Sequence, residues 1–330
     1  MPQPGFYHQD MLVSVLTAQP LDRLLDYKAP EGGCHAGAFV QVPLGPRKVI
    51  GVVWGPGRGG FDISKARSIT RVLDAPPMRE ELRQFLTRAA DYTITPLSAM
   101  LRLTTRAPGL SDPPSMRKVY RLGTTPPQRL TDARKRVIEA LDAHPGLSFT
   151  LAELAQLAEV SPSVIKGLAQ QGAVLEQDSP RDLPYPPLQP NFSPVTLTPD
   201  QAKASAALRQ AVQGGGYGCT LLKGVTGSGK TEVYLEAVAE CVKQGRQALV
   251  LLPEIALTAD FIARVQGRFG VKPGEWHSGI PLTERRRLWK MTAEGGVQLV
   301  VGARSALFLP FRELGLVVVD EEHDSSYALS

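Results

Sequence analysis

The sequence predicts a multidomain α/β protein, and three observations lead to this prediction. Apolar residues alternate on either side of a Gly-Pro turn near the N-terminus, which is typical of a β-hairpin. Three short amphipathic helices and a strand follow in the middle of the chain. The last third contains a strand, a glycine-rich loop, a helix and further buried strands, which together indicate a parallel sheet.

Composition and charge place the chain among globular proteins. Of its 330 residues 43% are hydrophobic and 21% charged, and 28 prolines favour linkers between domains. A net charge of +5 is too small to establish a nucleic-acid partner by itself. Cys34, Cys219 and Cys241 are too few and too scattered for a metal site or a disulfide framework. With no signal peptide and no apolar run of membrane-spanning length, we expect a cytoplasmic protein without a membrane partner.

The first domain is expected over residues 1–108 and is rich in β-structure. The stretch GAFVQVPLGPRKVIGVVWG predicts a hairpin, and SITRVLD adds a strand. From Met78 onward, apolar residues at helical spacing predict a helix that closes this domain. Nothing in this segment has the pattern of a catalytic site.

The second domain is expected over residues 109–182 as a basic linker and a winged helix. Thr150 and Glu153 form a capping box, and Ser161 and Gly172 bound the following helix. Three helices and a strand in this order are typical of the winged-helix form of helix-turn-helix. The module either reads DNA or contacts another protein, and Lys166 is the one basic residue on its presumed recognition helix.

Positive charge is concentrated between these two domains. Nine basic residues lie between Arg102 and Arg136, against two acidic ones. This stretch is either a solvated linker or a strip that contacts phosphates. A proline-rich linker over residues 183–195 then leads to the third domain, expected over residues 196–330.

A phosphate-binding loop opens the third domain. GVTGSGKT matches G-x-x-x-x-G-K-[ST] between a predicted strand, CTLLK, and a predicted helix. Backbone N–H groups of such a loop surround phosphates, and the helix N-terminus adds its positive dipole end. Lys230 would reach the β- and γ-phosphates of ATP, and Thr231 would bind Mg²⁺. A chance match within a glycine-rich loop is the alternative. The residues expected to hold the nucleotide are Gly224, Val225, Thr226, Gly227, Ser228, Gly229, Lys230 and Thr231.

An acidic cluster follows the apolar run LGLVVV near the end of the chain. A P-loop ATPase needs a carboxylate at the end of a buried parallel strand to hold Mg²⁺, and Asp320 occupies that place. Glu321 is placed to orient and deprotonate the attacking water. The alternative is an acidic loop that only solvates the end of a strand.

The motifs around this site resemble those of superfamily 2 helicases in type and order. DEEH is similar to their D-E-x-H motif, in which the histidine couples nucleotide state to nucleic acid, so His323 takes that role by resemblance; a purely structural histidine is the alternative. LTPDQAKA places Gln201 where related helicases read the adenine edge. ALVLLPEIALT and LVVGARSALFLP resemble motifs Ia and Ib, which implies DNA-backbone contacts by Thr258, Arg304 and Ser305.

Longer stretches resemble primosomal protein N′, the PriA family of bacterial replication-restart helicases. KGVTGSGKTEVYLE, LLPEIALT, VVGARSALFLPF and DEEHDSSY carry the resemblance over residues 197–327, and LDRLLDYKAP and VQVPLGPRKVIGVV are similar to the family's 3′-end-binding domain. The resemblance implies a RecA-like lobe and an ATP-driven 3′→5′ DNA helicase that acts on branched or forked DNA with a 3′ end. It also implies primosome proteins, single-stranded DNA-binding protein and the replicative helicase loader as partners.

The resemblance maps the family's 3′-end pocket onto four residues of the first domain. They are Leu25, Asp26, Gly45 and Arg67. Leu25 departs from the family, which usually has an aromatic residue at this position.

The family also continues past the acidic motif, into the rest of the lobe, a zinc module and a second lobe. The present match ends after Tyr327, so we expect the front part of such an enzyme, with an exposed sheet edge and no zinc-ligand set. A second lobe supplies an arginine worth ~10³–10⁵ in rate. The chain could therefore work as a fork-binding module without turnover. A P-loop ATPase joined to a winged-helix regulator is a third possibility.

Overall fold

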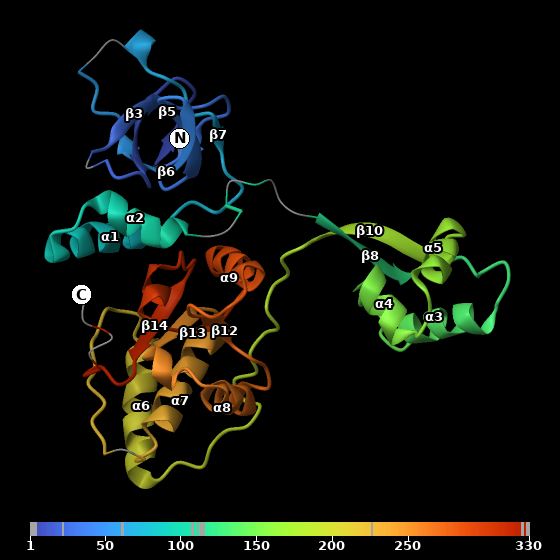
Figure 1. The fold of residues 1–330 in the computed structure, drawn as a ribbon. Helices are drawn as coiled ribbons and strands as arrows, with labels where there is room; N and C mark the ends of the chain where they lie inside the picture. The colour runs from blue at the N-terminus through green and yellow to red at the C-terminus, as the bar shows by residue number, and fades with distance from the viewer. Residues whose placement is uncertain are drawn as a thin grey trace. The chain divides into compact units, whose positions relative to one another are not determined.

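The computed structural model divides the chain into two compact units, Met1–Ser111 with Leu183–Ser330, and Asp112–Asp182 (Figure 1). The residues that it describes are 5–21, 23–60, 63–106, 109–110, 112, 116–225, 227–324 and 327. Within that part of the chain, no helix combines the length and the apolar character that crossing a membrane requires.

The N-terminal part of the first unit is an antiparallel sheet of five strands in the order β3-β2-β6-β5-β7. These strands are β2 (Leu12–Thr17), β3 (Leu25–Lys28), β5 (Phe39–Leu44), β6 (Arg47–Pro56) and β7 (Arg71–Val72). A separate short pair joins β1 (Phe6–Tyr7) to β4 (Cys34–His35). The hairpin expected from the sequence is β5 and β6, in which Leu44 pairs with Arg47 across the turn at Gly45. The sequence therefore predicted both strands of this hairpin and its turn.

Two helices, α1 (Glu80–Thr93) and α2 (Leu97–Thr105), follow this sheet. Leu86 of α1 and Leu101 of α2 are fully buried in one cluster with Phe39 of the sheet. The apolar spacing that predicted α1 from the sequence is the face that this cluster buries. A single turn of 3₁₀ helix, η1 (Ile63–Lys65), precedes β7.

The second unit contains three helices and a three-stranded antiparallel sheet in the order β10-β8-β9. Its elements are β8 (Met116–Leu122), α3 (Asp132–Asp142), β9 (Phe149–Thr150), α4 (Leu151–Leu157), α5 (Pro162–Gln170) and β10 (Val174–Pro180). The predicted capping box forms at the start of α4, where Thr150 and Glu153 exchange side-chain to backbone bonds. Val137, Leu154 and Ile165 are fully buried, one from each helix, so the helices share one core.

The remainder of the first unit, which we call the lobe, is built on a parallel sheet in the order β12-β13-β11-β14. The strands are β11 (Gln247–Leu251), β12 (Gly274–Trp276), β13 (Leu299–Gly302) and β14 (Leu314–Val319). The helical elements are α6 (Pro199–Gln213), α7 (Lys230–Lys243), η2 (Glu254–Ala256), α8 (Ala259–Phe269), α9 (Leu282–Glu294) and η3 (Arg304–Phe308). This α/β arrangement is consistent with a RecA-like lobe.

The strands of the lobe end in register. Leu251 pairs with Gly302 on one side and with Val319 on the other, and Trp276 pairs with Gly302. The loops that follow all four strands therefore leave the sheet at the same edge. In open parallel sheets that edge is where ligands bind.

The strand that the sequence predicted just before the glycine-rich loop is absent from the described sheets. Residues 219–223 run outside the four-stranded sheet, and the Leu221 side chain is 64% exposed. A β-strand exists only where a neighbouring strand completes its hydrogen bonds, and no described strand pairs with this segment. β14 is one edge of the sheet, and Val317 and Val319 on it are exposed.

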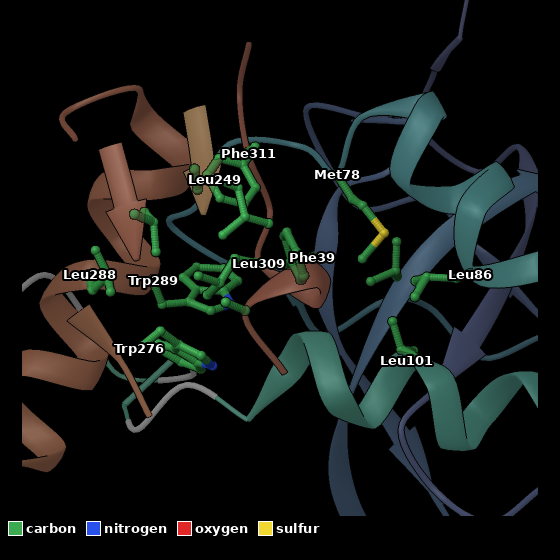
Figure 2. Close-up of a cluster of buried hydrophobic side chains, with 14 of the residues drawn as sticks. Phe39, Met78, Leu86, Leu101, Leu249, Trp276, Leu288, Trp289, Leu309 and Phe311 are labelled. Atoms are coloured by element: carbon green, nitrogen blue, oxygen red, sulfur yellow. The ribbon is translucent and has the colours of Figure 1, made fainter. Parts of the chain in front are cut away.

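The N-terminal sheet and the lobe share one apolar cluster (Figure 2). The Phe39 and Trp289 rings meet edge to face, with centroids 5.3 Å apart. The buried Trp289 indole N–H donates to the Thr104 carbonyl oxygen at 2.7 Å. Phe85 of α1 packs near Phe308 of η3, with ring centroids 5.7 Å apart. Segments that the sequence separates into a first and a third domain are thus joined in one compact unit.

Candidate functional site

The glycine-rich loop takes a left-handed backbone at two of its glycines. Gly227 has φ +79° and Gly229 has φ +78°, a region that other residues rarely adopt. A Cβ atom on Gly229 would also lie 2.3 Å from Nε2 of Gln201. Gly229 is the N-cap of α7, so the free N–H groups of the helix's first turn lie next to the loop. Thr226, expected to hold the nucleotide, lies outside the described residues.

Lys230 closes the loop through its ammonium group. Its Nζ donates to the Gly224 carbonyl oxygen at 2.8 Å and to the Val225 carbonyl oxygen at 3.3 Å. The Ser228 backbone N–H donates to the same Val225 carbonyl at 3.1 Å. The cation is therefore held at the centre of the loop by neutral carbonyl groups, which a phosphate oxygen can replace with a stronger, charge-assisted bond.

Gln201 connects the start of α6 to the loop. Its Oε1 accepts from the Thr198 backbone N–H at 2.9 Å as part of a capping box. Its Nε2 donates to the Ser228 carbonyl oxygen at 2.8 Å. Gln201 thus lies at the glycine-rich loop, and recognition of the adenine edge by its amide stays a prediction.

Asp320 follows β14 directly and is held by several bonds. Its backbone N–H donates to the Leu251 carbonyl oxygen at 3.0 Å, which continues the sheet register. Oδ1 accepts the Glu321 N–H at 3.0 Å, and Oδ2 accepts the Tyr234 hydroxyl at 2.9 Å. The Tyr327 hydroxyl donates to the Asp320 carbonyl oxygen at 2.9 Å. The Asp320 side chain is therefore oriented from both of its oxygens.

Tyr234 is a residue that sequence reasoning missed. It lies one turn after Lys230 on α7 and is only 4% exposed. Burial raises the pKa of its hydroxyl far above the ordinary value, and the charge of Asp320 raises it further. The Thr231 side chain, three residues earlier on α7, acts on the pKa of this hydroxyl in the opposite direction. The signal in the sequence is the i, i+3 and i, i+4 spacing of Tyr234 from Thr231 and Lys230, which puts the three on one face of a helix.

The oxygen atoms of Thr231 and Asp320 suit Mg²⁺ as metal ligands better than they suit a softer metal. Thr231 offers a hydroxyl oxygen and Asp320 a carboxylate; Tyr234 hydrogen-bonds to Asp320 and lies one turn after Thr231 on α7. Among the described residues there is no cluster of three or more His, Cys, Asp or Glu side chains that could enclose a metal. Mg²⁺ in nucleotide sites uses one or two protein oxygens together with phosphate oxygens and water. The residues present therefore fit a nucleotide-bound magnesium ion.

Glu321 and His323 lie together beyond Asp320. Glu321 has φ +53°, a left-handed conformation that is strained for a residue with a side chain. Nε2 of His323 is 3.4 Å from the Glu321 carboxylate, and its Nδ1 is 3.9 Å from that of Glu322. The His323 side chain is 74% exposed, so it is accessible to a ligand or another chain.

The residues expected to contact DNA in the lobe follow adjacent strands. Thr258 is the N-cap of α8, after β11, and its Oγ1 accepts the Phe261 N–H at 3.3 Å. Arg304 and Ser305 open η3, directly after β13. Because β11 and β13 are parallel neighbours whose ends are in register, both loops lie on the edge of the sheet that also holds Asp320. Thr258 and Ser305 are exposed there.

The residues expected at the 3′-end pocket form two bonded groups on the N-terminal sheet. Oδ1 of Asp26 accepts the Ser14 hydroxyl at 2.8 Å, and Oδ2 accepts the backbone N–H groups of Arg58 and Gly59 at 2.8 and 3.0 Å. Sequence reasoning missed this support, because Ser14 and the loop at Arg58 are far from Asp26 in the chain.

The second of these groups contains Arg67 and Gly45. The Arg67 guanidinium donates to the Gly45 carbonyl oxygen at 3.3 Å. The Arg67 carbonyl accepts the N–H of Lys28, three residues after Leu25 on β3. In the second unit, Lys166 is exposed on α5.

Two family models match the chain in separate parts. The 3′ DNA-binding domain (3′BD) matches residues 14–105, and the DEAD/DEAH box helicase matches residues 198–328. The first range contains Asp26 and Arg67. The second range contains Gln201, Lys230 and Asp320.

Curated relatives match almost the whole chain. Replication restart protein PriA of Bacillus subtilis (strain 168) is 29% identical over 96% of this chain and 49% of its own length. PriA of Haemophilus influenzae is 33% identical over 96% of this chain and 45% of its own length. PriA of Chlamydia pneumoniae is 30% identical over 96% of this chain and 44% of its own length. The chain thus spans about half the length of the curated relatives it matches.

Proposed function

Because the chain belongs to the PriA replication-restart family, we propose that it carries the nucleotide-binding part of an ATP-dependent 3′→5′ DNA helicase. In this proposal the lobe binds ATP with Mg²⁺ and the DNA backbone. The N-terminal sheet binds the 3′ end of a strand at a stalled or branched fork. The complete activity belongs to the longer protein that the relatives represent.

One observation is the main support for an ATP site in this proposal. The helix after the glycine-rich loop and the carboxylate after β14 meet through the bond from Tyr234 to Asp320, 2.9 Å long. Lys230 and Thr231 begin that same helix. The glycine-rich loop and the Asp320 carboxylate are thus close together. This favours a shared role in nucleotide hydrolysis over a separate structural role for each.

The residues divide the chemistry of hydrolysis among them. A bound Mg²⁺ would supply positive charge that offsets the negative charge developing on the phosphates. Lys230 would exchange its loop carbonyls for phosphate oxygens, while Asp320 and Thr231 would hold the ion. Glu321 would orient the attacking water and accept its proton. His323, exposed beside Glu321, would couple this event to bound DNA.

DNA binding is assigned to three surfaces. In the lobe, Thr258, Arg304 and Ser305 would contact the phosphate backbone. In the second unit, which we assign as a winged helix, Lys166 would face DNA or a partner protein.

The third surface is the 3′-end pocket on the N-terminal sheet. Three of the roughly four acceptor positions of the Asp26 carboxylate are already used, so one remains for a terminal hydroxyl. Leu25, Gly45 and Arg67 would form the rest of this pocket.

The protein partners in this proposal follow from the proposed substrate, a stalled or branched fork. A protein that loads a helicase at a fork would meet single-stranded DNA-binding protein, the other primosome proteins and the loader of the replicative helicase. None of these requires a membrane surface.

A second candidate is a fork-binding module without turnover. The observation that favours it is the incomplete pairing around the site: β14 is a sheet edge, and residues 219–223 lie outside the described sheet. Hydrolysis in this class also uses an arginine from a second lobe, worth ~10³–10⁵ in rate.

The two candidates differ in the rate of ATP hydrolysis by the purified chain. The assay measures Mg²⁺-dependent phosphate release with and without forked DNA that has a free 3′ end, and Lys230→Ala is the control. Fork-stimulated hydrolysis that the substitution abolishes supports the helicase proposal for the chain alone. Binding of both ligands without phosphate release supports the module, and failure to bind ATP contradicts the nucleotide site.

A further inference from the structure

We propose that Tyr234 is a positioning residue for nucleotide-bound magnesium. Its hydroxyl holds the Asp320 carboxylate, and it lies on the same helix face as Thr231; these are the two protein groups that would hold the ion. The inference rests on the proposed ATP site and adds to it a residue outside the glycine-rich loop and the acidic motif. Tyr234 itself would not touch the ion or the phosphates. Its effect would come through Asp320.

The Tyr234 ring is fixed by the core of the lobe. It is 4% exposed and belongs to the apolar cluster that also buries Val238 of α7 and Val250 of β11. A ring held in this way cannot turn its hydroxyl away without disturbing the core. A tyrosine hydroxyl has an ordinary pKa of about 10, so it is protonated and can donate at neutral pH.

The hydroxyl connects α7 to the end of β14. It donates to Oδ2 of Asp320 at 2.9 Å. Thr231 lies on α7 and Asp320 at the end of β14, and the bond from Tyr234 to Asp320 joins residues 86 positions apart in sequence. One tyrosine therefore sets the spacing between the two candidate ligands before an ion is present.

Asp320 depends on this support because of its place in the sheet. It follows an edge strand whose last residue, Val319, is 47% exposed. Without the tyrosine hydroxyl, the Asp320 carboxylate would keep the bond from the Glu321 N–H at Oδ1. A carboxylate has about four acceptor positions, so these two bonds leave the others free for the ion or its water molecules.

The test removes only the hydroxyl. Tyr234→Phe keeps the buried ring, and water can replace the lost bond at the half-buried Asp320, so the melting temperature should change little. Groups that orient a metal ligand typically change metal affinity by about 10–100-fold when they are removed. We therefore expect the Mg²⁺ concentration that half-saturates nucleotide binding to rise by about tenfold.

The measurement uses the full chain and a fluorescent ATP analogue, titrated with Mg²⁺ and, separately, in EDTA. Tyr120→Phe is the matched control, because that hydroxyl donates to the Glu176 carboxylate at 2.8 Å in the second unit, and it should leave both titrations unchanged. In Tyr234→Phe the affinity in EDTA should also be unchanged. In an Asp320→Asn background, Tyr234→Phe should have no further effect on the Mg²⁺ dependence.

Three outcomes would overturn the inference. An unchanged Mg²⁺ half-saturation would show that the hydroxyl does not position the ligands. An equal loss of affinity in EDTA would show that Tyr234 only maintains the loop. A further loss in the Asp320→Asn background would show that the tyrosine acts elsewhere. If the unaltered chain binds no nucleotide at all, the proposed function itself fails, which is a separate result.

Discussion

Gly229 is subject to two constraints, one on its backbone angle and one on the space around it, and any larger side chain would violate both. Its φ of +78° is left-handed, and a Cβ atom would fall 2.3 Å from Nε2 of Gln201. The first constraint makes a substitution strained, and the second breaks the contact that fixes Gln201 to the loop. The loop geometry at the start of α7 therefore depends on a hydrogen atom at this one position.

Gly229→Ala should lower nucleotide affinity by about tenfold or more, because left-handed strain of roughly 1–3 kcal/mol falls on the loop that we propose surrounds the phosphates. Titration of a fluorescent ATP analogue measures the change. Gly216→Ala is the control, since a methyl group on Gly216 would have no neighbour within 4 Å and its φ is not positive. Equal affinities for the two variants would contradict the role given to Gly229.

The sequence indicates single candidate residues of the site but not the residues that support them. The motifs of the glycine-rich loop and of the acidic segment are local, so Lys230 and Asp320 are candidates even without a fold. Tyr234 is not, because it resembles any core aromatic on a helix until β14 brings Asp320 against it at 2.9 Å. Ser14, which supports Asp26 at 2.8 Å, was missed for the same reason.

Individual elements were predicted where their ends carry chemical signals. The capping box at Thr150 and the Ser161-Pro162 start of α5 both predicted the correct helix starts, because these signals act within one turn. The strand expected at residues 219–223 was wrong, because strand formation depends on a neighbour that the local pattern cannot supply.

The edge strand β14 should make the chain associate with itself. An exposed, apolar edge offers unpaired backbone groups to another chain, and Val317 is 40% exposed on it. Val317→Lys should therefore shift the chain toward the monomer in concentration-dependent light scattering. Leu282→Lys changes a residue that is 66% exposed at the start of α9, away from this edge, and should leave association unchanged. A monomeric unaltered chain at all concentrations would contradict this prediction.

For the molecule as a whole, the shared core of the N-terminal sheet and the lobe has the largest consequence. Trp289 is 3% exposed, contacts Phe39 edge to face, and donates to the Thr104 carbonyl at 2.7 Å (Figure 2). Trp289 and Thr104 lie 185 residues apart in sequence, so no local pattern predicted their contact. The first and third segments should therefore unfold as one cooperative unit.

Trp289→Ala should destabilise that unit by about 3–5 kcal/mol, as expected when a large buried aromatic side chain is removed. The two halves of the unit should then melt in separate steps in calorimetry. Trp289→Phe keeps a ring against Phe39 but loses the bond to Thr104, and a smaller loss is expected. Separate transitions for residues 1–111 and 183–330 in the unaltered chain, in addition to that of the second unit, would contradict a shared core.

ATP and forked DNA should bind at separate sites of this chain, the first at Lys230 and the second on the N-terminal sheet and its neighbours. The sharpest test measures both affinities for the unaltered chain and for Lys230→Ala, with a fluorescent ATP analogue and a labelled fork that has a free 3′ end. We expect the substitution to abolish ATP binding and to leave fork affinity unchanged. Loss of both affinities, or ATP binding that survives without Lys230, would show that the two sites are not separate or that the nucleotide binds elsewhere.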